Sequence, residues 1–113
     1  MPGAAIEVVQ AFNDAVNRGD LDALAALMSD DHRFVDAAGS VVDGKAACVA
    51  AWRGLFAAFP DYRNRFAAVT AIDDTRVSVE GRSDCSSPEL TGPARWFVQV
   101  RDGLVTEWRV EDA

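Results

Sequence analysis

The feature that most constrains the fold is a change in the spacing of apolar residues near the middle of the chain. Up to about residue 59 they recur every three or four positions, which is the period of an amphipathic helix. After that point β-branched and aromatic residues become frequent and alternate with polar ones, as is typical of strands. Helices and strands that are segregated along the chain predict an α+β fold rather than repeated βαβ units.

Three helices are expected in the first half, and their ranges are 4–18, 21–28 and 45–58. Asp20 is suited to cap the second helix, and Asp43 is expected to cap the third. Pro60 ends the third helix because proline cannot continue it. A short strand at 32–36 lies between the second and third helices.

A four-strand antiparallel meander is expected in the second half, over 62–72, 76–84, 95–101 and 104–110. The Asp-Asp pair at 73–74 and the Asp-Gly pair at 102–103 are turn sequences, and the second is a strong hairpin signal. The polar stretch 86–93 holds two prolines and is long for a hairpin loop, so we expect it to overhang the mouth of a pocket. With 113 residues, the chain is expected to form a single domain over 1–113.

Composition narrows the classes of partner. The formal net charge of −7 argues against binding nucleic acid or an anionic membrane. No apolar stretch is long enough to span a bilayer, and the N-terminal segment lacks the basic start of a signal peptide, so a cytoplasmic protein is expected. Two distant cysteines, Cys48 and Cys85, are expected to be reduced, and both look like small buried apolar residues. His32 is the only histidine and no CxxC or HxxxH spacing exists, so no metal site is predicted. His32 is expected to be exposed, and no cofactor is predicted.

Four segments of the sequence resemble those of a known family: "FNDAVNRGDLDALAALMSDD", "VDGKAA", "AFPDYR" and "RDGLVTEWRV". Together with the element order, they resemble the nuclear transport factor 2-like superfamily and, within it, SnoaL-like polyketide cyclases and ketosteroid isomerases. The resemblance implies a cone-shaped, curved antiparallel sheet wrapped around the N-terminal helix, with an apolar pocket at the open end. It also implies a homodimer through the sheet face and a small apolar molecule as ligand. The fold hosts many functions, so function has to be argued from the site.

Asp36 is the first candidate for chemistry. In the word "FVDAAGS" it matches the aspartate that shuttles a proton between carbons in ketosteroid isomerase-like members, and Gly39 and Ser40 support this register. That chemistry needs a carboxylate in a partly apolar site, beside donors that stabilise an oxyanion. The family's donors are replaced here by Phe12 and Trp96, so a steroid isomerase of the usual design is not expected. The competing interpretation is a polar strand end that caps its loop.

Arg82 and Asp84 are the second candidates. An Arg-x-Asp pair on the equivalent strand resembles part of the limonene epoxide hydrolase site, although the third member of that site is missing here. Plain alternation along this strand places both side chains on its outer face. A bulge at Gly81 would reverse the alternation and turn them inward. Alternation along the last predicted strand, 104–110, likewise places Glu107 on a solvated or dimer-interface face.

The aromatic residues are generous for a chain this short, and a cone with an apolar cavity needs them. The predicted ligand-binding residues are Phe12, Phe34, Trp52, Phe56, Tyr62, Trp96 and Trp108. Three hypotheses stay open. The chain is an enzyme acting on an apolar, oxygenated molecule (an isomerase, cyclase or hydrolase with Asp36 as acid or base), a ligand-binding domain without turnover, or a dimerising protein-interaction module.

Overall fold

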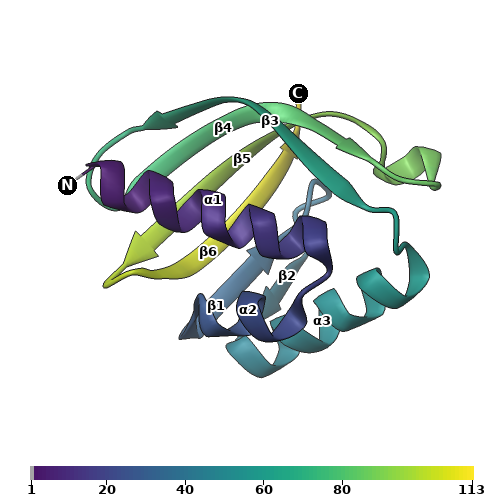
Figure 1. Cartoon of the computed structure of the whole chain (residues 1–113), viewed down its shortest axis with the longest axis horizontal. Coiled ribbons are helices and arrows are strands. Elements are labelled where there is room, and N and C mark those ends of the chain that lie inside the picture. Colours follow the sequence, from purple (N-terminus) through teal and green to yellow (C-terminus); the bar gives the residue numbers. More distant parts are fainter. Residues whose placement is uncertain (1) are drawn as a thin grey trace.

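The computed structural model describes residues 2–113 and the side chains from residue 3 onward. Over this range the chain forms three α-helices, one 3₁₀ helix and six strands (Figure 1). None of the described helices is long and apolar enough to cross a membrane. In chain order the elements are α1 (Pro2–Arg18), α2 (Leu21–Ala26), β1 (Met28–Val35), β2 (Val41–Asp43), α3 (Lys45–Ala58), β3 (Arg63–Ala71), β4 (Arg76–Asp84), η1 (Pro88–Leu90), β5 (Gly92–Arg101) and β6 (Leu104–Asp112).

All six strands belong to one curved sheet in the order β2-β1-β6-β5-β4-β3. β1 and β6 are parallel, and every other neighbouring pair is antiparallel. The predicted α+β fold and the four-strand meander are confirmed, but two short strands join the meander where only one was expected. β2 was not predicted, and β1 begins at Met28 instead of His32. The pairing of β1 with β6 shifts register between Met28 and Arg33, and this irregularity hid the start of the strand.

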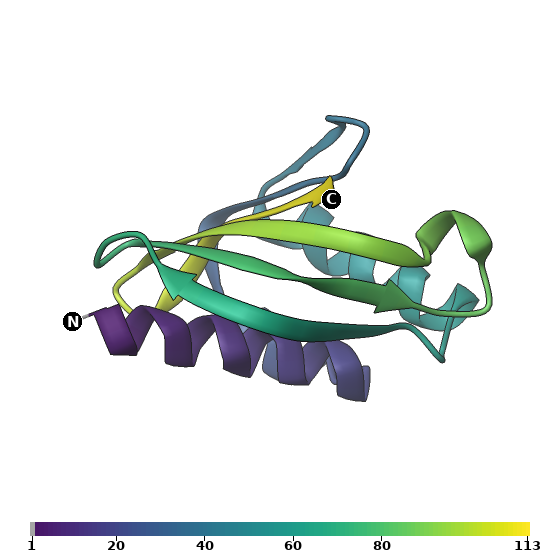
Figure 2. The same ribbon diagram turned by 90° about the horizontal axis from the view of Figure 1, so that it is seen from above.

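Helix α1 lies across one face of the sheet, over β3 to β6 (Figures 1 and 2). Val9, Phe12 and Val16 lie on the buried stripe of the helix and have almost no exposed surface. The Phe12 ring stacks on that of Trp108, with ring centroids 4.4 Å apart. Because burial of each such side chain contributes about 1.5–3 kcal/mol, this layer between helix and sheet forms the main part of the core.

Helix α3 covers the other end of the sheet and packs on β1 and β2. Its bounds are those predicted, but the predicted cap is wrong. Asp43 pairs with Arg33 in the ladder between β2 and β1, and Gly44 is the N-cap, with no side-chain hydrogen bond. Gly44 has φ of 94°, which a residue with a side chain adopts rarely, so the turn from β2 into α3 depends on glycine.

A bulge lies midway along the edge strand β3 and not, as considered from the sequence, on β4. Phe66 pairs with Gly81 and Ala68 pairs with Glu80, so Ala67 is the extra residue. Gly81 is required there because a Cβ atom would lie 2.1 Å from the carbonyl oxygen of Arg65. The alternation of β4 therefore continues unbroken through Gly81.

His32 is fully buried, so the prediction of an exposed histidine is wrong. Its neighbours Asp31 and Arg33 take the other face of β1, and its ring packs on Phe12 at a centroid distance of 5.8 Å. Nδ1 donates to the carbonyl oxygen of Val105 over 2.7 Å, since a carbonyl can only accept. Burial lowers the pKa of the ring, and Nε2 has no partner among the described residues.

Candidate ligand pocket

A pocket of about 320 Å³ lies between α3, the ends of β1, β4 and β6, the start of β5 and the loop that carries η1. Figures 1 and 2 show η1 and the C-terminal end of α3 at the same end of the molecule, away from the N-terminus. Most of the lining residues are apolar. The lining consists of Phe34, Asp36, Ala37, Ala51, Trp52, Leu55, Tyr62, Ser83, Glu89, Leu90, Thr91, Gly92, Pro93, Ala94, Val110 and Asp112.

Asp36 is part of this lining and directly follows β1. Its Oδ1 accepts hydrogen bonds from the backbone N–H groups of Ala38 and Ser40, both over 2.9 Å. The backbone N–H of Asp36 donates to the Ser40 carbonyl, and Gly39 donates to the Asp36 carbonyl. These bonds close the tight loop between β1 and β2 and fix the carboxyl group. Its second oxygen, Oδ2, has no hydrogen bond within the described part of the chain.

Tyr62 and Ser83 form the polar part of the wall on the other side. The Tyr62 hydroxyl lies 3.3 Å from Ser83 Oγ, and Ser83 Oγ donates to Asn64 Oδ1 over 2.8 Å. Burial raises the pKa of Tyr62, and the hydrogen bond to Ser83 opposes this only in part, so the phenol is neutral at pH 7.

Asn64 lies behind this pair and is held from α1. Asn17 receives a hydrogen bond from the Asn64 backbone N–H over 2.7 Å and donates one to the Asn64 carbonyl over 2.9 Å. Asn13 donates to the same carbonyl over 3.2 Å. Sequence reasoning missed both Asn64 and Ser83. The alternation of β4 is the signal that points to Ser83, since Val77, Val79 and Ser83 share the buried face.

The predicted ligand-binding residues fall into two groups. Phe34, Trp52 and Tyr62 line the pocket, and the first two rings meet edge to face with centroids 5.6 Å apart. The others belong to the core or pack against it, outside the pocket lining; they are Phe12, Phe56, Trp96 and Trp108. Residues 89–93, from the stretch expected to overhang the mouth of a pocket, form part of the lining.

Arg82 and Asp84, the other two predicted catalytic residues, lie on the outer face of β4. The alternation is unbroken, so it directs Ser83 inward and its two neighbours outward. Arg82 Nε donates to Asp84 Oδ1 over 3.0 Å, and Arg65 Nε donates to Asp84 Oδ2 over 3.1 Å. The two arginines lower the pKa of Asp84, with Arg82 as the larger cause. Neither Arg82 nor Asp84 lines the pocket.

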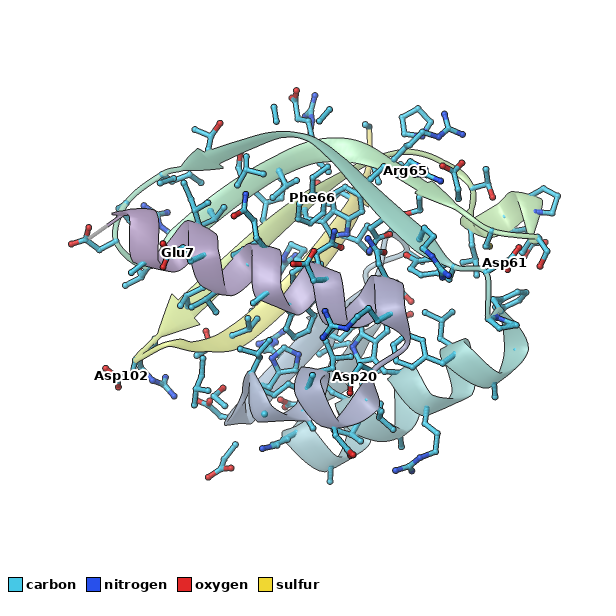
Figure 3. All side chains as sticks on the ribbon, in the orientation of Figure 1. Glu7, Asp20, Asp61, Arg65, Phe66 and Asp102 are labelled. Atoms are coloured by element: carbon cyan, nitrogen blue, oxygen red, sulfur yellow. The ribbon has the colours of Figure 1, made fainter. Side chains whose placement is uncertain are left out.

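Arg65 and Phe66, both labelled in Figure 3, point to opposite faces of the sheet. They are neighbours on β3, yet the Phe66 ring packs on Trp96 in the core with centroids 5.1 Å apart. The Arg65 side chain is 69% exposed and binds Asp84 on the outside. The Arg82–Asp84 pair is thus part of an outer charged cluster, separated from the pocket by the sheet.

Glu107 also differs from its expected solvated position. It lies on the predicted face, but only 9% of its surface is exposed. Arg33 and Arg109 flank it, with N–O distances of 3.4 Å and 3.3 Å. The two neighbouring arginines explain how a carboxylate is accommodated with so little exposure on the sheet face.

The two cysteines are free, as predicted. Cys48 is buried, whereas Cys85 is only partly buried and its sulfur contacts the backbone of Ser87. Within residues 2–113, no group of three or more histidine, cysteine, aspartate or glutamate side chains is arranged to hold a metal ion.

The sequence and the fold both match a known family. The family model for the SnoaL-like domain matches residues 9–108, so the chain belongs to the SnoaL-like domain family. The resemblance carried by the four sequence segments is thereby confirmed. None of the curated proteins matches the chain.

Three solved structures illustrate the similarity. A predicted polyketide cyclase from Xanthomonas campestris is 28% identical, with 98% of this chain and 91% of that chain covered and a TM-score of 0.83. An LEH-like epoxide hydrolase from M. tuberculosis is 21% identical, with 98% and 79% covered and a TM-score of 0.85. A computationally designed 17-OHP binder is 18% identical, with 97% and 91% covered and a TM-score of 0.84. The last two establish likeness of fold alone.

Proposed function

We propose that this SnoaL-like protein is a cofactor-independent isomerase, cyclase or hydrolase that acts on an apolar, oxygenated small molecule, with Asp36 as its acid or base. The observation that supports this most is the hydrogen bonding of the Asp36 carboxyl group in the pocket wall. Two backbone N–H groups hold Oδ1, and Oδ2 has no partner among the described residues. A carboxylate held by one oxygen presents the other to a substrate in a reproducible position.

The proposed step is a proton transfer. A C–H bond next to a substrate carbonyl breaks, its proton goes to Asp36 Oδ2, and its electron pair moves onto the carbonyl oxygen to form an enolate. An isomerase returns the proton at another carbon. A cyclase instead joins the enolate carbon to a second carbonyl carbon of the same molecule, and the oxygen of that carbonyl takes the π electron pair and then the proton held by Asp36. In a hydrolase the same carboxylate takes a proton from the water that attacks an epoxide carbon, while the bond from that carbon to the epoxide oxygen breaks and the released oxygen takes the proton back from Asp36.

The similarity to a predicted polyketide cyclase supports a cyclase among these reaction classes, whereas the likeness to the epoxide hydrolase is one of fold. The catalytic role predicted for Arg82 and Asp84 stays a prediction. Their position on the outer face of the sheet makes Asp36 the first group to test.

The alternative is a ligand-binding domain without turnover or a dimerising interaction module of the same fold. The loop-closing hydrogen bonds that Asp36 accepts from Ala38 and Ser40 favour the ligand-binding form, because they account for the aspartate without any chemistry. A computationally designed 17-OHP binder has a similar fold. A homodimer through the sheet face also stays a proposal.

The test is turnover of a panel of enolisable ketones, poly-β-ketone esters and epoxides by the wild-type protein and by Asp36→Asn. Asparagine can still accept the bonds from Ala38 and Ser40, so the loop is retained while the base is lost. Asp112→Asn, at another acid of the pocket lining, is the matched control. The proposal predicts turnover of at least one class, lost in Asp36→Asn and kept in Asp112→Asn. Equal turnover by both variants would assign the chemistry to another group, and turnover of no class would favour the ligand-binding alternative.

A further inference from the structure

The residues that line the pocket include hydrogen-bond donors. The Tyr62 hydroxyl is one, and its bond to Ser83 is long at 3.3 Å. Trp52 also lines the pocket and is 3% exposed. Its indole Nε1–H is buried without a hydrogen-bond partner among the described residues. That nitrogen has almost no accessible surface, so a ligand in the pocket does not contact it.

The direction of the hydrogen bonds leaves the Tyr62 proton available. Asn64 Oδ1 can only accept, so Ser83 gives its single hydroxyl proton to Asn64. Ser83 is therefore the acceptor in its contact with Tyr62. Because that contact is long, the Tyr62 O–H loses little when it turns to a closer acceptor in the pocket.

The backing of this pair is rigid. Asn64 is 2% exposed and is tied to α1 by three hydrogen bonds with Asn13 and Asn17. Ser83 is bonded to Asn64 and is itself 6% exposed. A fixed Ser83 limits the positions of the Tyr62 hydroxyl, which favours an oxygen bound at one defined place.

Charge restricts the kind of oxygen. Besides Tyr62, the ionisable side chains in the pocket lining are Asp36, Glu89 and Asp112, and all three are acids. With the Tyr62 phenol neutral and no arginine or lysine in the lining, a bound carboxylate would meet only like charges. Transfer of an unpaired charge into a partly apolar pocket is unfavourable, and like charges add to that cost.

We infer that the hydroxyl of Tyr62, positioned by Ser83 and Asn64, binds an uncharged acceptor oxygen, so that the pocket takes neutral ketones or lactones and rejects carboxylates. This inference rests on the proposal that the pocket binds an apolar, oxygenated molecule. It adds the residues that hold the oxygen and the charge state of the ligand. Tyr62 binds the ligand directly, and Ser83 and Asn64 act as positioning residues.

Three probes of similar size separate the contributions, and equilibrium dialysis at pH 7 measures the binding of each. They are 2-acetylnaphthalene, which carries a ketone, 2-ethylnaphthalene, which carries none, and 2-naphthoate, which carries a carboxylate. The wild-type protein is expected to bind the ketone about 3- to 10-fold more tightly than the hydrocarbon, the worth of one hydrogen bond between uncharged groups. The carboxylate is expected to bind at least about tenfold more weakly than the ketone.

Tyr62→Phe removes only the hydroxyl and is expected to abolish the preference for the ketone while leaving the affinity for the hydrocarbon unchanged. Ser78→Ala is the control, because it removes a hydroxyl from the outer face of the same strand that carries Ser83. A Tyr62→Phe protein that keeps the ketone preference, or a wild type that binds 2-naphthoate as tightly as the ketone, overturns the inference but not the proposed function. If neither neutral probe binds to the wild type, both are overturned.

A second measurement does not depend on any variant. Tyr62 is the only tyrosine, so one carbon-13 NMR signal from tyrosine labelled at Cζ reports its titration alone. A carbonyl that accepts from the phenol stabilises the protonated form. Saturation with 2-acetylnaphthalene is therefore expected to move the midpoint to higher pH than saturation with 2-ethylnaphthalene does. Equal midpoints with the two bound probes contradict a hydrogen bond from Tyr62 to the ketone.

Discussion

The substitution Gly81→Ala tests the strand arrangement that turns Ser83 toward the pocket. The new Cβ would lie 2.1 Å from the Arg65 carbonyl oxygen and 3.1 Å from the Phe66 Cα. Ordinary contact begins at 3.4 Å, so β3 and β4 would have to separate locally by about 1.3 Å. The obstructing atoms belong to the backbone and cannot rotate away. We therefore expect a loss near the upper end of the usual cost of overpacking, about 3 kcal/mol.

Thermal unfolding followed by circular dichroism measures this loss. For 113 residues the typical entropy of unfolding converts 1 kcal/mol to about 4 °C, so Tm should fall by about 12 °C. Gly54→Ala is the matched control. Gly54 lies within α3, and a Cβ atom added there would meet nothing within 4 Å, so alanine should stabilise by about 0.8–1 kcal/mol. A Gly81→Ala protein that melts within about 2 °C of the wild type would refute the close approach of the two strands.

Three further predictions concern the core, the pocket wall and the outer face. Because burial lowers the pKa of His32 from its usual 6.5, its contribution to the free energy of unfolding is complete above about pH 6.5 and is lost as the pH falls below that value, by at most about 1.4 kcal/mol per pH unit. In urea titrations at several pH values, His32→Asn should remove this dependence of stability on pH, and a dependence that persists contradicts its assignment to His32. The aspartates with a lowered pKa do not account for it, because they lose their contribution only below pH 3.8. Ser83→Ala leaves Asn64 Oδ1 without its donor and should lower the free energy of unfolding in urea by about 1–3 kcal/mol, whereas Ser78→Ala should change it by no more than about 0.5 kcal/mol. Equal effects would contradict the buried hydrogen bond from Ser83 to Asn64. Arg82→Gln should leave the binding of 2-acetylnaphthalene unchanged in equilibrium dialysis, and a loss of more than about threefold would place Arg82 in contact with the pocket.

Much of the architecture follows from short-range patterns. The period of the apolar residues was sufficient to predict α3 and β4 with the bounds that they have in the structure. The start of β1 was missed because its register shift between Met28 and Arg33 breaks the alternation that identifies a strand. The cap of α3 was misassigned because Asp43 is a good capping residue whose backbone is used by β2 instead. In both cases a pairing between distant segments outweighed the local preference.

The site was harder to predict, for a related reason. Alternation along β4 correctly separates its two faces, but a charged Arg-x-Asp pair is a stronger sequence signal for a catalytic site than the Ser83 between its members. Because the bulge lies on β3 and not on β4, Ser83 faces inward while Arg82 and Asp84 face outward. No residue in the sequence of β3 predicts the position of this bulge. His32 was misjudged because its charged neighbours in sequence lie on the other face of the strand. Asn64 could not be assigned a role, since its partners Asn13 and Asn17 are 51 and 47 positions away.

The claim that Asp36 takes a proton from a ligand in the pocket can be tested directly by hydrogen exchange. The methyl protons of 2-acetylnaphthalene lie next to its carbonyl, so their replacement by deuterium in D₂O, followed by proton NMR, reports formation of the enolate. We predict that the wild-type protein accelerates this exchange over buffer, that Asp36→Asn abolishes the acceleration, and that Asp112→Asn keeps it. Exchange at the rate of buffer while the ketone is bound, or unchanged acceleration in Asp36→Asn, would contradict the role of Asp36 as the base.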